Sequence, residues 1–202
     1  MKDYYEARAP EYDEWYRSLG RFDGLERERW DDELRDLERT LANLPPRRTL
    51  DVACGTGFLT RHLRGQVTGL DQSPSMLSIA RSRLPAASFL EGDALDLPFA
   101  AGSFERILTG HFYGHLEPGV RERFLEQARR VAPELVVVDS AVRPDRRLEE
   151  WQERTLNDGS RWSVYKRYLS PATLLAELGG GEVLMAGRWF VVARFDGSPL
   201  AG

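Results

Sequence analysis

The stretch Thr49-Leu50-Asp51-Val52-Ala53-Cys54-Gly55-Thr56-Gly57-Phe58-Leu59-Thr60 decides the fold, because a short apolar run ends there in a glycine-rich turn. The run is partly β-branched, which is typical of a buried parallel strand. Gly55 and Gly57 can adopt positive φ, and without a Cβ they let the backbone approach a ligand closely. Such a turn, after the first strand of an open α/β sheet, is where nucleotide-like ligands bind.

The residues of the turn distinguish between two kinds of nucleotide ligand. A dinucleotide-binding turn reads G-x-G-x-x-G and places a pyrophosphate at the amino end of a helix. Here Thr60 occupies the third glycine position, and Asp51 opens the motif. Because like charges in a cleft repel, a carboxylate beside the ligand favours a cation over a phosphate. The turn therefore predicts a positively charged nucleoside.

Four segments, in order, resemble the class I S-adenosylmethionine (SAM) dependent methyltransferases of the small-molecule, type 11-like branch. Leu50–Gly57 is similar to the first motif of that branch, L-D-V-x-C-G-T-G, and Gly69–Ser73 to the end of its second strand. Glu91–Ala94 resembles its adenine-side loop, and Gly102–Phe104 the start of its fourth strand. The resemblance covers roughly residues 45 to 140. It implies a Rossmann-like, doubly wound α/β sheet of seven strands in the order 3-2-1-4-5-7-6, with the last strand antiparallel.

The resemblance also implies SAM as the cofactor, with S-adenosylhomocysteine (SAH) as product. Asp71 lies twenty residues after Asp51, close to the ~20-residue offset at which an acid reaches the ribose hydroxyls. Asp93 would accept from the adenine amino group. For both acids the alternative is a side chain that merely opens a turn. The candidate cofactor-binding residues are Asp51, Ala53, Cys54, Gly55, Thr56, Gly57, Asp71, Gln72, Met76, Asp93, Ala94, Leu95, Thr109, Gly110 and Tyr12.

The segment Thr109–Leu116 follows the fourth expected strand and contains two of the three histidines of the chain. His111, Tyr113 and His115 are the candidate catalytic residues, because histidine is the natural base near neutral pH. Two histidines also permit a metal site, but no third ligand is evident, so we expect no metal.

Aromatic residues gather near the amino terminus, where Tyr12, Trp15 and Tyr16 share one helical face. One interpretation is that residues 1–24 form a lid whose aromatic rings cover cofactor and substrate and attract a sulfonium. The alternative is a hydrophobic stripe that packs on the core. The candidate substrate-binding residues are Tyr5, Trp15, Tyr16, Trp151 and Tyr165.

The segment 151–168 combines aromatic rings with Arg and Lys. This composition suits a flat or anionic small molecule, and an ordinary packing layer is the alternative. The polar segment 143–157 is expected to be helical, and 160–169 to be a strand. A helix is also expected over residues 58–63.

Composition limits the remaining possibilities. With 202 residues, of which 42% are hydrophobic, we expect one domain over residues 1–202. The net charge of −4 argues against a nucleic-acid surface, and no apolar run approaches the ~20 residues that span a bilayer. Cys54 is the only cysteine, so an internal disulfide is impossible. We expect a cytoplasmic monomer or homodimer.

The predicted function is transfer of a methyl group from SAM to a small-molecule acceptor, mainly by in-line positioning and with a histidine base where the acceptor carries a proton. A SAM-binding domain without catalytic activity is an alternative, because the family has no obligatory catalytic residue. An NAD-dependent dehydrogenase is another, and Thr60 and Asp51 argue against it.

Overall fold

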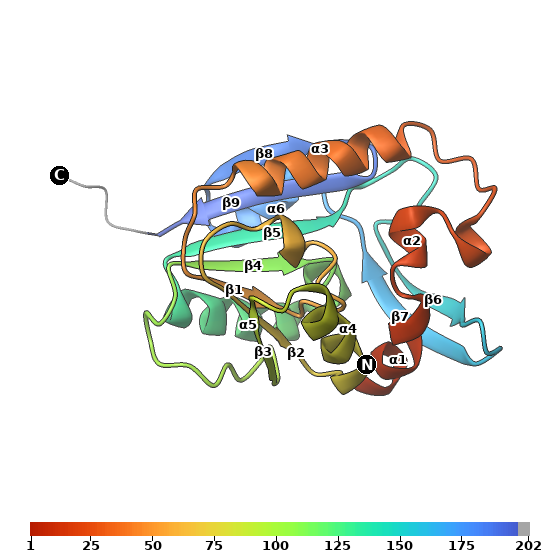
Figure 1. Cartoon of the computed structure of the whole chain (residues 1–202). Helices are drawn as coiled ribbons and strands as arrows, with labels where there is room; N and C mark the ends of the chain where they lie inside the picture. Colours follow the sequence, from red (N-terminus) through yellow and green to blue (C-terminus); the bar gives the residue numbers. More distant parts are fainter. Residues whose placement is uncertain (198–202) are drawn as a thin grey trace.

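The computed structural model describes residues 1–197, and its main feature is a seven-stranded sheet in the order β3-β2-β1-β4-β5-β9-β8 (Figure 1). β1 to β5 are parallel, whereas β9 runs antiparallel to β5, and β8 antiparallel to β9. Numbered by themselves, these strands follow the order 3-2-1-4-5-7-6, so the predicted order and the antiparallel last strand are confirmed. The bounds are β1 Thr49–Val52, β2 Val67–Asp71, β3 Ser88–Glu91, β4 Arg106–Gly110, β5 Glu134–Ser140, β8 Glu182–Ala186 and β9 Phe190–Asp196.

Alternate residues of the central strands are buried on opposite faces of the sheet. In β5, Val137 packs into one hydrophobic cluster, and Val136 and Val138 pack into the other. Successive side chains of a strand point to opposite faces, so a continuous apolar run fills both layers. All seven residues of β5 are buried.

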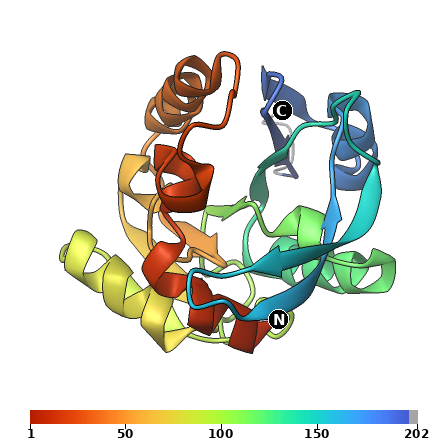
Figure 2. The same ribbon diagram turned by 90° about the vertical axis from the view of Figure 1, so that its right-hand side faces the viewer.

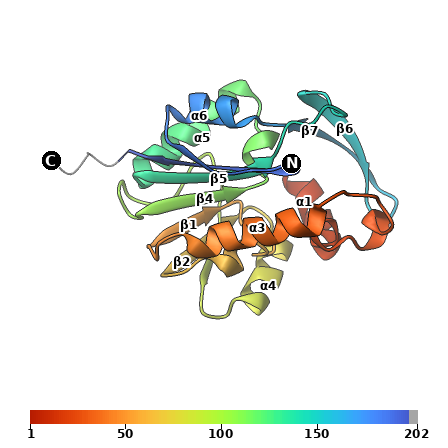
Figure 3. The ribbon, with the colours of Figure 1, turned by 90° about the horizontal axis from the view of Figure 1, so that it is seen from above.

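Helices cover both faces of the sheet, with α3 and α4 on one side and α5 and α6 on the other (Figure 3). α4 and α6 each begin at a Ser-Pro pair. The Ser73 hydroxyl accepts from the Met76 N–H at 3.1 Å, and the Ser170 hydroxyl from the Thr173 N–H at 3.0 Å. The bounds are α3 Trp30–Asn43, α4 Pro74–Arg83, α5 Pro118–Val131 and α6 Pro171–Leu178.

The amino-terminal segment crosses the end of the sheet at which the parallel strands finish, next to a two-stranded hairpin (Figures 1 and 2). Tyr4 packs there against Leu156 and Val164 of the hairpin. The segment consists of α1 Lys2–Arg8, the 3-10 turn η1 Ala9–Glu11, α2 Glu14–Arg17 and the 3-10 turn η2 Gly20–Phe22, and the hairpin of β6 Glu149–Thr155 and β7 Arg161–Arg167.

Two predicted helices are wrong. The polar segment 143–157 contains no helix, and its residues Glu149–Thr155 form β6, in which exposed and half-buried residues alternate with the period of a strand. Its partner β7 confirms the strand expected over 160–169. The helix expected over 58–63 is reduced to the 3-10 turn η3, Thr60–His62, because Leu63 is already extended and Gly65 turns the chain with a φ of 98°.

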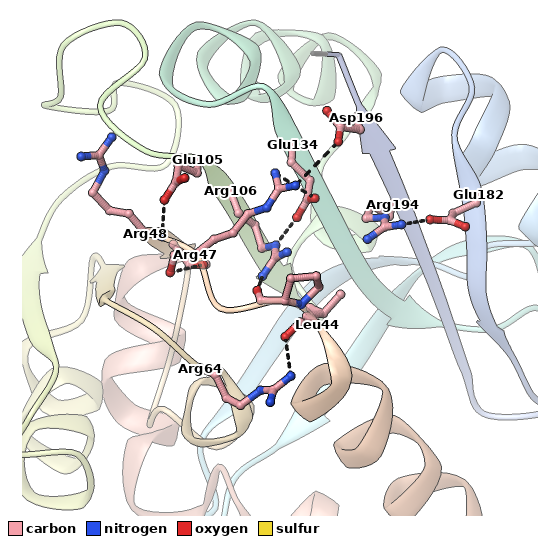
Figure 4. A network of polar contacts seen from close by, with 12 residues as sticks. Leu44, Arg47, Arg48, Arg64, Glu105, Arg106, Glu134, Glu182, Arg194 and Asp196 are labelled. Atoms are coloured by element: carbon pink, nitrogen blue, oxygen red, sulfur yellow. Dashed lines mark hydrogen bonds and ion pairs between the residues drawn. The ribbon is translucent and has the colours of Figure 1, made fainter. Parts of the chain in front are cut away.

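A buried ion pair joins the amino ends of β4 and β5, far from the hairpin (Figure 4). The Arg106 guanidinium donates to the Glu134 carboxylate, and both side chains are buried. Arg106 also donates to the Pro45 carbonyl at 2.9 Å, and Arg47 lies 3.2 Å from the second oxygen of Glu134. These contacts attach the linker between α3 and β1 to the sheet.

Candidate functional site

A cavity of about 280 Å³, the first cavity, lies where the chain leaves the parallel strands. Its wall includes Gly55 after β1, Asp71 at the end of β2, Asp93 after β3 and Gly110 at the end of β4. Tyr5 of α1 closes it from the side of the amino-terminal segment. The strand order reverses between β1 and β4, and open α/β sheets bind ligands at such a switch point.

The Asp71 carboxylate is held firmly at this cavity. It is 7% exposed and accepts from the backbone N–H groups of Gly55 and Ser73, each at 2.9 Å. Burial raises the pKa of Asp71 above its ordinary value, while these hydrogen bonds oppose the rise. Each oxygen keeps acceptor capacity after these bonds, which is what a pair of ligand hydroxyls requires.

The backbone of the glycine turn adopts the left-handed region at Ala53, Gly55 and Gly57, with φ values of 57°, 54° and 71°. A Cβ added at Gly55 would lie 3.5 Å from the ring of Tyr12, on the cavity side, so the absent side chain leaves room for a ligand. Ala53 accepts a strained conformation there, which is a frequent feature of ligand sites.

Asp51 lies behind the turn rather than in the first cavity. It is buried and accepts from the Thr60 hydroxyl at 2.6 Å, and it borders a void of only about 10 Å³ beside Tyr12 and Gly110. Burial raises the pKa of Asp51 to about 7, and the charge of Asp71 adds to the rise. A cation bound beyond the turn would favour the ionised form.

The structure brings ten of the fifteen predicted cofactor-binding residues to the wall of the first cavity: Tyr12, Ala53, Gly55, Asp71, Gln72, Met76, Asp93, Ala94, Leu95 and Gly110. The side chains of Cys54, Thr56 and Thr109 serve the structure of the turn. Cys54 packs toward Gly69, Thr56 donates to Asp13 at 2.6 Å, and Thr109 donates to the Val52 carbonyl at 2.9 Å. Asp51 and Gly57 also lie outside this wall.

His111 lies where the first cavity meets a second one. It is 8% exposed, has a φ of 54°, and within residues 1–197 neither ring nitrogen has a hydrogen-bond partner. Its ring packs against Trp15, with centroids 4.9 Å apart. Burial lowers the pKa of His111 to about 4, so the imidazole is neutral at pH 7.

His115 also faces both cavities. Its Nδ1 lies 2.6 Å from the Tyr165 carbonyl oxygen. A carbonyl only accepts, so Nδ1 carries the proton and Nε2 is left as an acceptor. Burial lowers the pKa of His115, and the charges of Lys166 and Arg154 add to this effect.

Tyr113 does not reach either cavity, contrary to its predicted catalytic position. It is buried, its ring packs near Phe124 of α5, and its hydroxyl donates to Glu177 of α6 at 2.9 Å. The turn Tyr113–His115 thus directs His115 toward the cavities and Tyr113 toward the helices on the opposite side.

A larger second cavity, of about 770 Å³, lies between the amino-terminal segment and the hairpin. Five residues line both cavities: Tyr5, Tyr12, His111, His115 and Trp151. Of the predicted substrate-binding residues, Tyr5, Trp15 and Trp151 line the second cavity and Tyr165 lines the first. Tyr16 lines neither, because it is stacked on Phe58 at a centroid distance of 3.9 Å.

The sequence interpretation missed Arg8, Arg27 and Arg143 in the second cavity. Arg8 follows Tyr4 by four residues, and residues i and i+4 of a helix share a face. This spacing could have indicated that Arg8 lies on the same side of the helix as the aromatic residues.

Two acids hold the amino-terminal segment against α4 and the glycine turn. Glu6 accepts from the Ser73 hydroxyl at 2.5 Å and from the Ser75 N–H at 3.2 Å, at the amino end of α4. Asp13 accepts from the Thr56 hydroxyl at 2.6 Å and pairs with Arg83. Both contacts attach the segment directly beside the glycine turn and Asp71.

The described part of the chain contains no group of three or more His, Cys, Asp and Glu side chains placed to bind a metal ion. No helix within residues 1–197 has the length and apolarity that crossing a membrane requires.

Residues 49–134 match the family described as "Methyltransferase domain". The chain is 41% identical over 91 residues to demethylmenaquinone methyltransferase of Thermotoga maritima. The matched region covers 43% of the chain and 39% of that protein. The chain is 35% identical over 124 residues to phthiotriol/phenolphthiotriol dimycocerosates methyltransferase of Mycobacterium leprae. Here the matched region covers 56% of the chain and 44% of that protein. The chain thus spans roughly two fifths of the length of these curated relatives.

Solved structures of DhpI resemble nearly the whole chain. The DhpI-SAH complex superposes with a TM-score of 0.74 at 28% identity, over 98% of this chain and 95% of that one. The DhpI-SAM-HEP complex has a TM-score of 0.72 at 26% identity, over 95% and 94%. The likeness therefore extends beyond residues 49–134, to the amino-terminal helices and the hairpin that enclose the second cavity.

Proposed function

The chain belongs to the class I S-adenosylmethionine-dependent methyltransferases, and on this premise we propose that it transfers a methyl group from SAM to a small-molecule acceptor. The observation that carries the proposal is the position of His111, a buried imidazole without a partner in the described residues, between an acid-lined cavity at the switch point and a second, larger cavity. One cavity suits the methyl donor, and the other suits the acceptor.

The residues of the first cavity fit this donor. Asp71 would bind the ribose hydroxyls through the acceptor capacity that Gly55 and Ser73 leave free. Asp93 would bind the adenine amino group, because its side chain already orders the adjacent loop by accepting from the Leu95 N–H at 2.9 Å. The space beside Gly55, which a Cβ would fill, suits the amino-acid part. The complexes of DhpI with SAM and SAH support this assignment.

The reaction requires orientation more than acid–base chemistry. When bound, SAM supplies a methyl carbon that its sulfonium makes electrophilic, and it departs as a neutral thioether. The chain must align the acceptor atom with that carbon and exclude water, and the half-buried rings of Tyr5 and Tyr12 are placed for this in the wall common to both cavities. Where the acceptor carries a proton, His111 would be the base, because its ring nitrogens have no partner in the described residues and the ring lies on the wall common to both cavities.

We further propose that residues 1–24 act as a lid. In this conformation Glu6 and Asp13 hold the segment over the first cavity, and Tyr5 and Tyr12 form part of the cavity wall. A ligand as large as SAM would need the segment to move before it could enter or leave.

Calorimetric titration of the purified chain with SAM, SAH and NAD tests the proposal, together with a screen for methyl transfer from labelled SAM to a metabolite library. We expect SAM and SAH to bind and NAD not to bind. Binding of NAD without binding of SAM would refute the proposed donor. Binding of SAM without transfer to any acceptor would favour a binding domain without catalytic activity.

A further inference from the structure

The second cavity is rich in positive charge although the chain as a whole carries a net charge of −4. Basic side chains on its wall outnumber acidic ones by seven to four. Some of these charges are paired, since Lys166 lies 2.6 Å from Asp139 and Arg143 lies 3.2 Å from Asp145. Four others, Arg8, Arg21, Arg27 and Arg154, form no ion pair with an Asp or Glu of the described residues, and of these Arg8 and Arg154 share one hydrogen-bond acceptor.

Arg8 and Arg154 donate to the same neutral oxygen. Nη1 of Arg8 lies 2.6 Å from the Tyr4 hydroxyl, and Nη1 of Arg154 lies 3.2 Å from it. Arg154 comes from β6 and Arg8 from α1, so two distant parts of the chain bring two cations together here. Nη2 of Arg154 donates to Gln152, which in turn donates to Glu150, and this is the nearest carboxylate in the hydrogen-bonded network of Arg154.

The arrangement leaves Arg8 without an opposite charge, because the rings of Tyr4 and Tyr12, whose centroids lie 5.6 and 5.2 Å from its Cζ, are neutral. Arg8 is only 7% exposed, and its buried Nε has no partner within residues 1–197. A guanidinium taken out of water needs an opposite charge or a full set of acceptors, and a second cation nearby makes the need greater. Two planar guanidinium groups that converge on one point match the oxygens of a carboxylate or phosphate.

We propose that the methyl acceptor carries an oxyanion group, a carboxylate or a phosphate-type group, which Arg8 and Arg154 bind in the second cavity. This inference rests on the proposed function, whose acceptor class it specifies. Tyr5 connects the two parts of the site, because its ring lies 4.9 Å from that of Tyr4 and 6.4 Å from that of His115. An acceptor held by its anionic end at Arg8 and Arg154 would extend past Tyr5 toward the histidines and the first cavity.

The test measures the binding of simple probes to the SAH-saturated chain by calorimetry. Benzoate and inorganic phosphate represent the two sources of the oxyanion, and benzamide is the neutral counterpart of benzoate. Arg154→Gln removes one charge of the pair. Arg161→Gln is the matched control, because Arg161 lies on the same hairpin, is exposed and does not line the cavity.

We expect benzoate or phosphate to bind saturably, benzamide to bind at least tenfold more weakly than benzoate, and Arg154→Gln to weaken the binding of the preferred anion at least tenfold. Arg161→Gln should change that affinity less than twofold. Arg154→Lys should restore part of it, and Arg8→Gln should reproduce the loss if it folds. Failure of both anions to bind, equal binding of benzamide, or an equal loss in Arg161→Gln would overturn the inference. Because SAH binding is measured in the same samples, failure of the donor site is recognised separately.

Discussion

Asp71 accepts a hydrogen bond of 2.9 Å from the backbone N–H of Gly55, so the acid at the end of β2 is attached to the glycine turn after β1. The two features that identify a nucleoside site in the sequence are therefore one connected unit in the fold. Replacing Asp71 removes the carboxylate that is proposed to bind the ribose, and it also removes the hydrogen bond that holds the glycine turn.

We predict that Asp71→Ala weakens SAH binding by about 1.5–3 kcal/mol, the loss expected when hydrogen bonds to a charged group disappear. Calorimetry gives the affinity directly. Asp96→Ala is the control, because Asp96 lies in the loop after β3, close to Asp93, but does not line the first cavity. An unchanged affinity of the Asp71 variant for SAH would show that this carboxylate does not bind the sugar.

His111 and His115 should act on the acceptor side. We expect His111→Ala to lower turnover by roughly 10²-fold or more for an acceptor that must lose a proton, since general bases contribute about 10²–10⁴. We expect His115→Ala to lower turnover as well, and both variants to keep SAM affinity within about threefold. His62→Ala, at the third histidine, should change neither. Loss of SAM binding without a specific loss of turnover would contradict the assignment.

The pH profile provides an independent test of His111. Burial lowers its pKa to about 4, and only the neutral ring can accept a proton. At saturating SAM, the value of kcat/KM for the acceptor should therefore stay level as the pH falls from 8 through 6 and decline only toward pH 4. A decline centred near 6.5, the ordinary value for histidine, would point to a different, exposed base.

Much of the first cavity, the proposed cofactor site, was predictable because the course of the backbone at the strand ends determines it. Gly55, Asp71 and Gly110 lie at strand ends, and strand ends follow from short apolar runs and the turns after them. The acceptor half was less accessible. In Glu149–Thr155 the alternation of exposed and half-buried residues involves mostly polar side chains, so the sequence of this strand resembles that of an exposed helix. The proximity of Arg8 and Arg154 depends on how the hairpin packs on α1, which the sequence does not show. The sequence did not reveal that Tyr113 and His115 point to different sides, which follows from the 3-10 turn Tyr113–His115, with its three residues per turn.

The pKa of Asp51 makes the stability of the fold depend on pH. Its folded value of about 7 lies above the ordinary value of 3.8, so the folded state binds this proton more tightly than the unfolded state. The resulting stability is fully present below pH 3.8 and is lost as the pH rises through 7. Asp51→Asn keeps an acceptor for Thr60 but does not titrate. Its free energy of unfolding, relative to that of the wild type, should therefore rise by on the order of 1–3 kcal/mol when the pH is raised from 4.5 to 7.5, since one pKa unit corresponds to about 1.4 kcal/mol. Urea denaturation at both pH values measures the difference, and a constant difference would refute the shift.

The pair Arg106–Glu134 should stabilise the fold without affecting the site. Glu134→Gln leaves Arg106 buried without its carboxylate, which we expect to cost about 3–5 kcal/mol of unfolding free energy. Glu182→Gln, which removes the more exposed partner of Arg194, should cost less than about 1 kcal/mol. Equal effects in the two variants would show that burial does not distinguish the pairs.

If residues 1–24 act as the proposed lid, Glu6 should determine how long it stays closed. It lies on α1 and accepts from Ser73 and Ser75 at the amino end of α4, where the positive end of the helix dipole favours a carboxylate. Glu6→Ala removes these contacts while leaving every residue of the first cavity in place, so we expect the dissociation rate of SAH to rise by about 3–10-fold, as a loss of roughly 1 kcal/mol implies. Stopped-flow tryptophan fluorescence reports the rate, because Trp15 lies within the proposed lid segment and lines the second cavity. Asp3→Ala is the matched control, because Asp3 is an exposed acid on the same helix. If the two variants release SAH at the same rate as the wild type, the segment does not open through this contact, and access to the first cavity must follow another route.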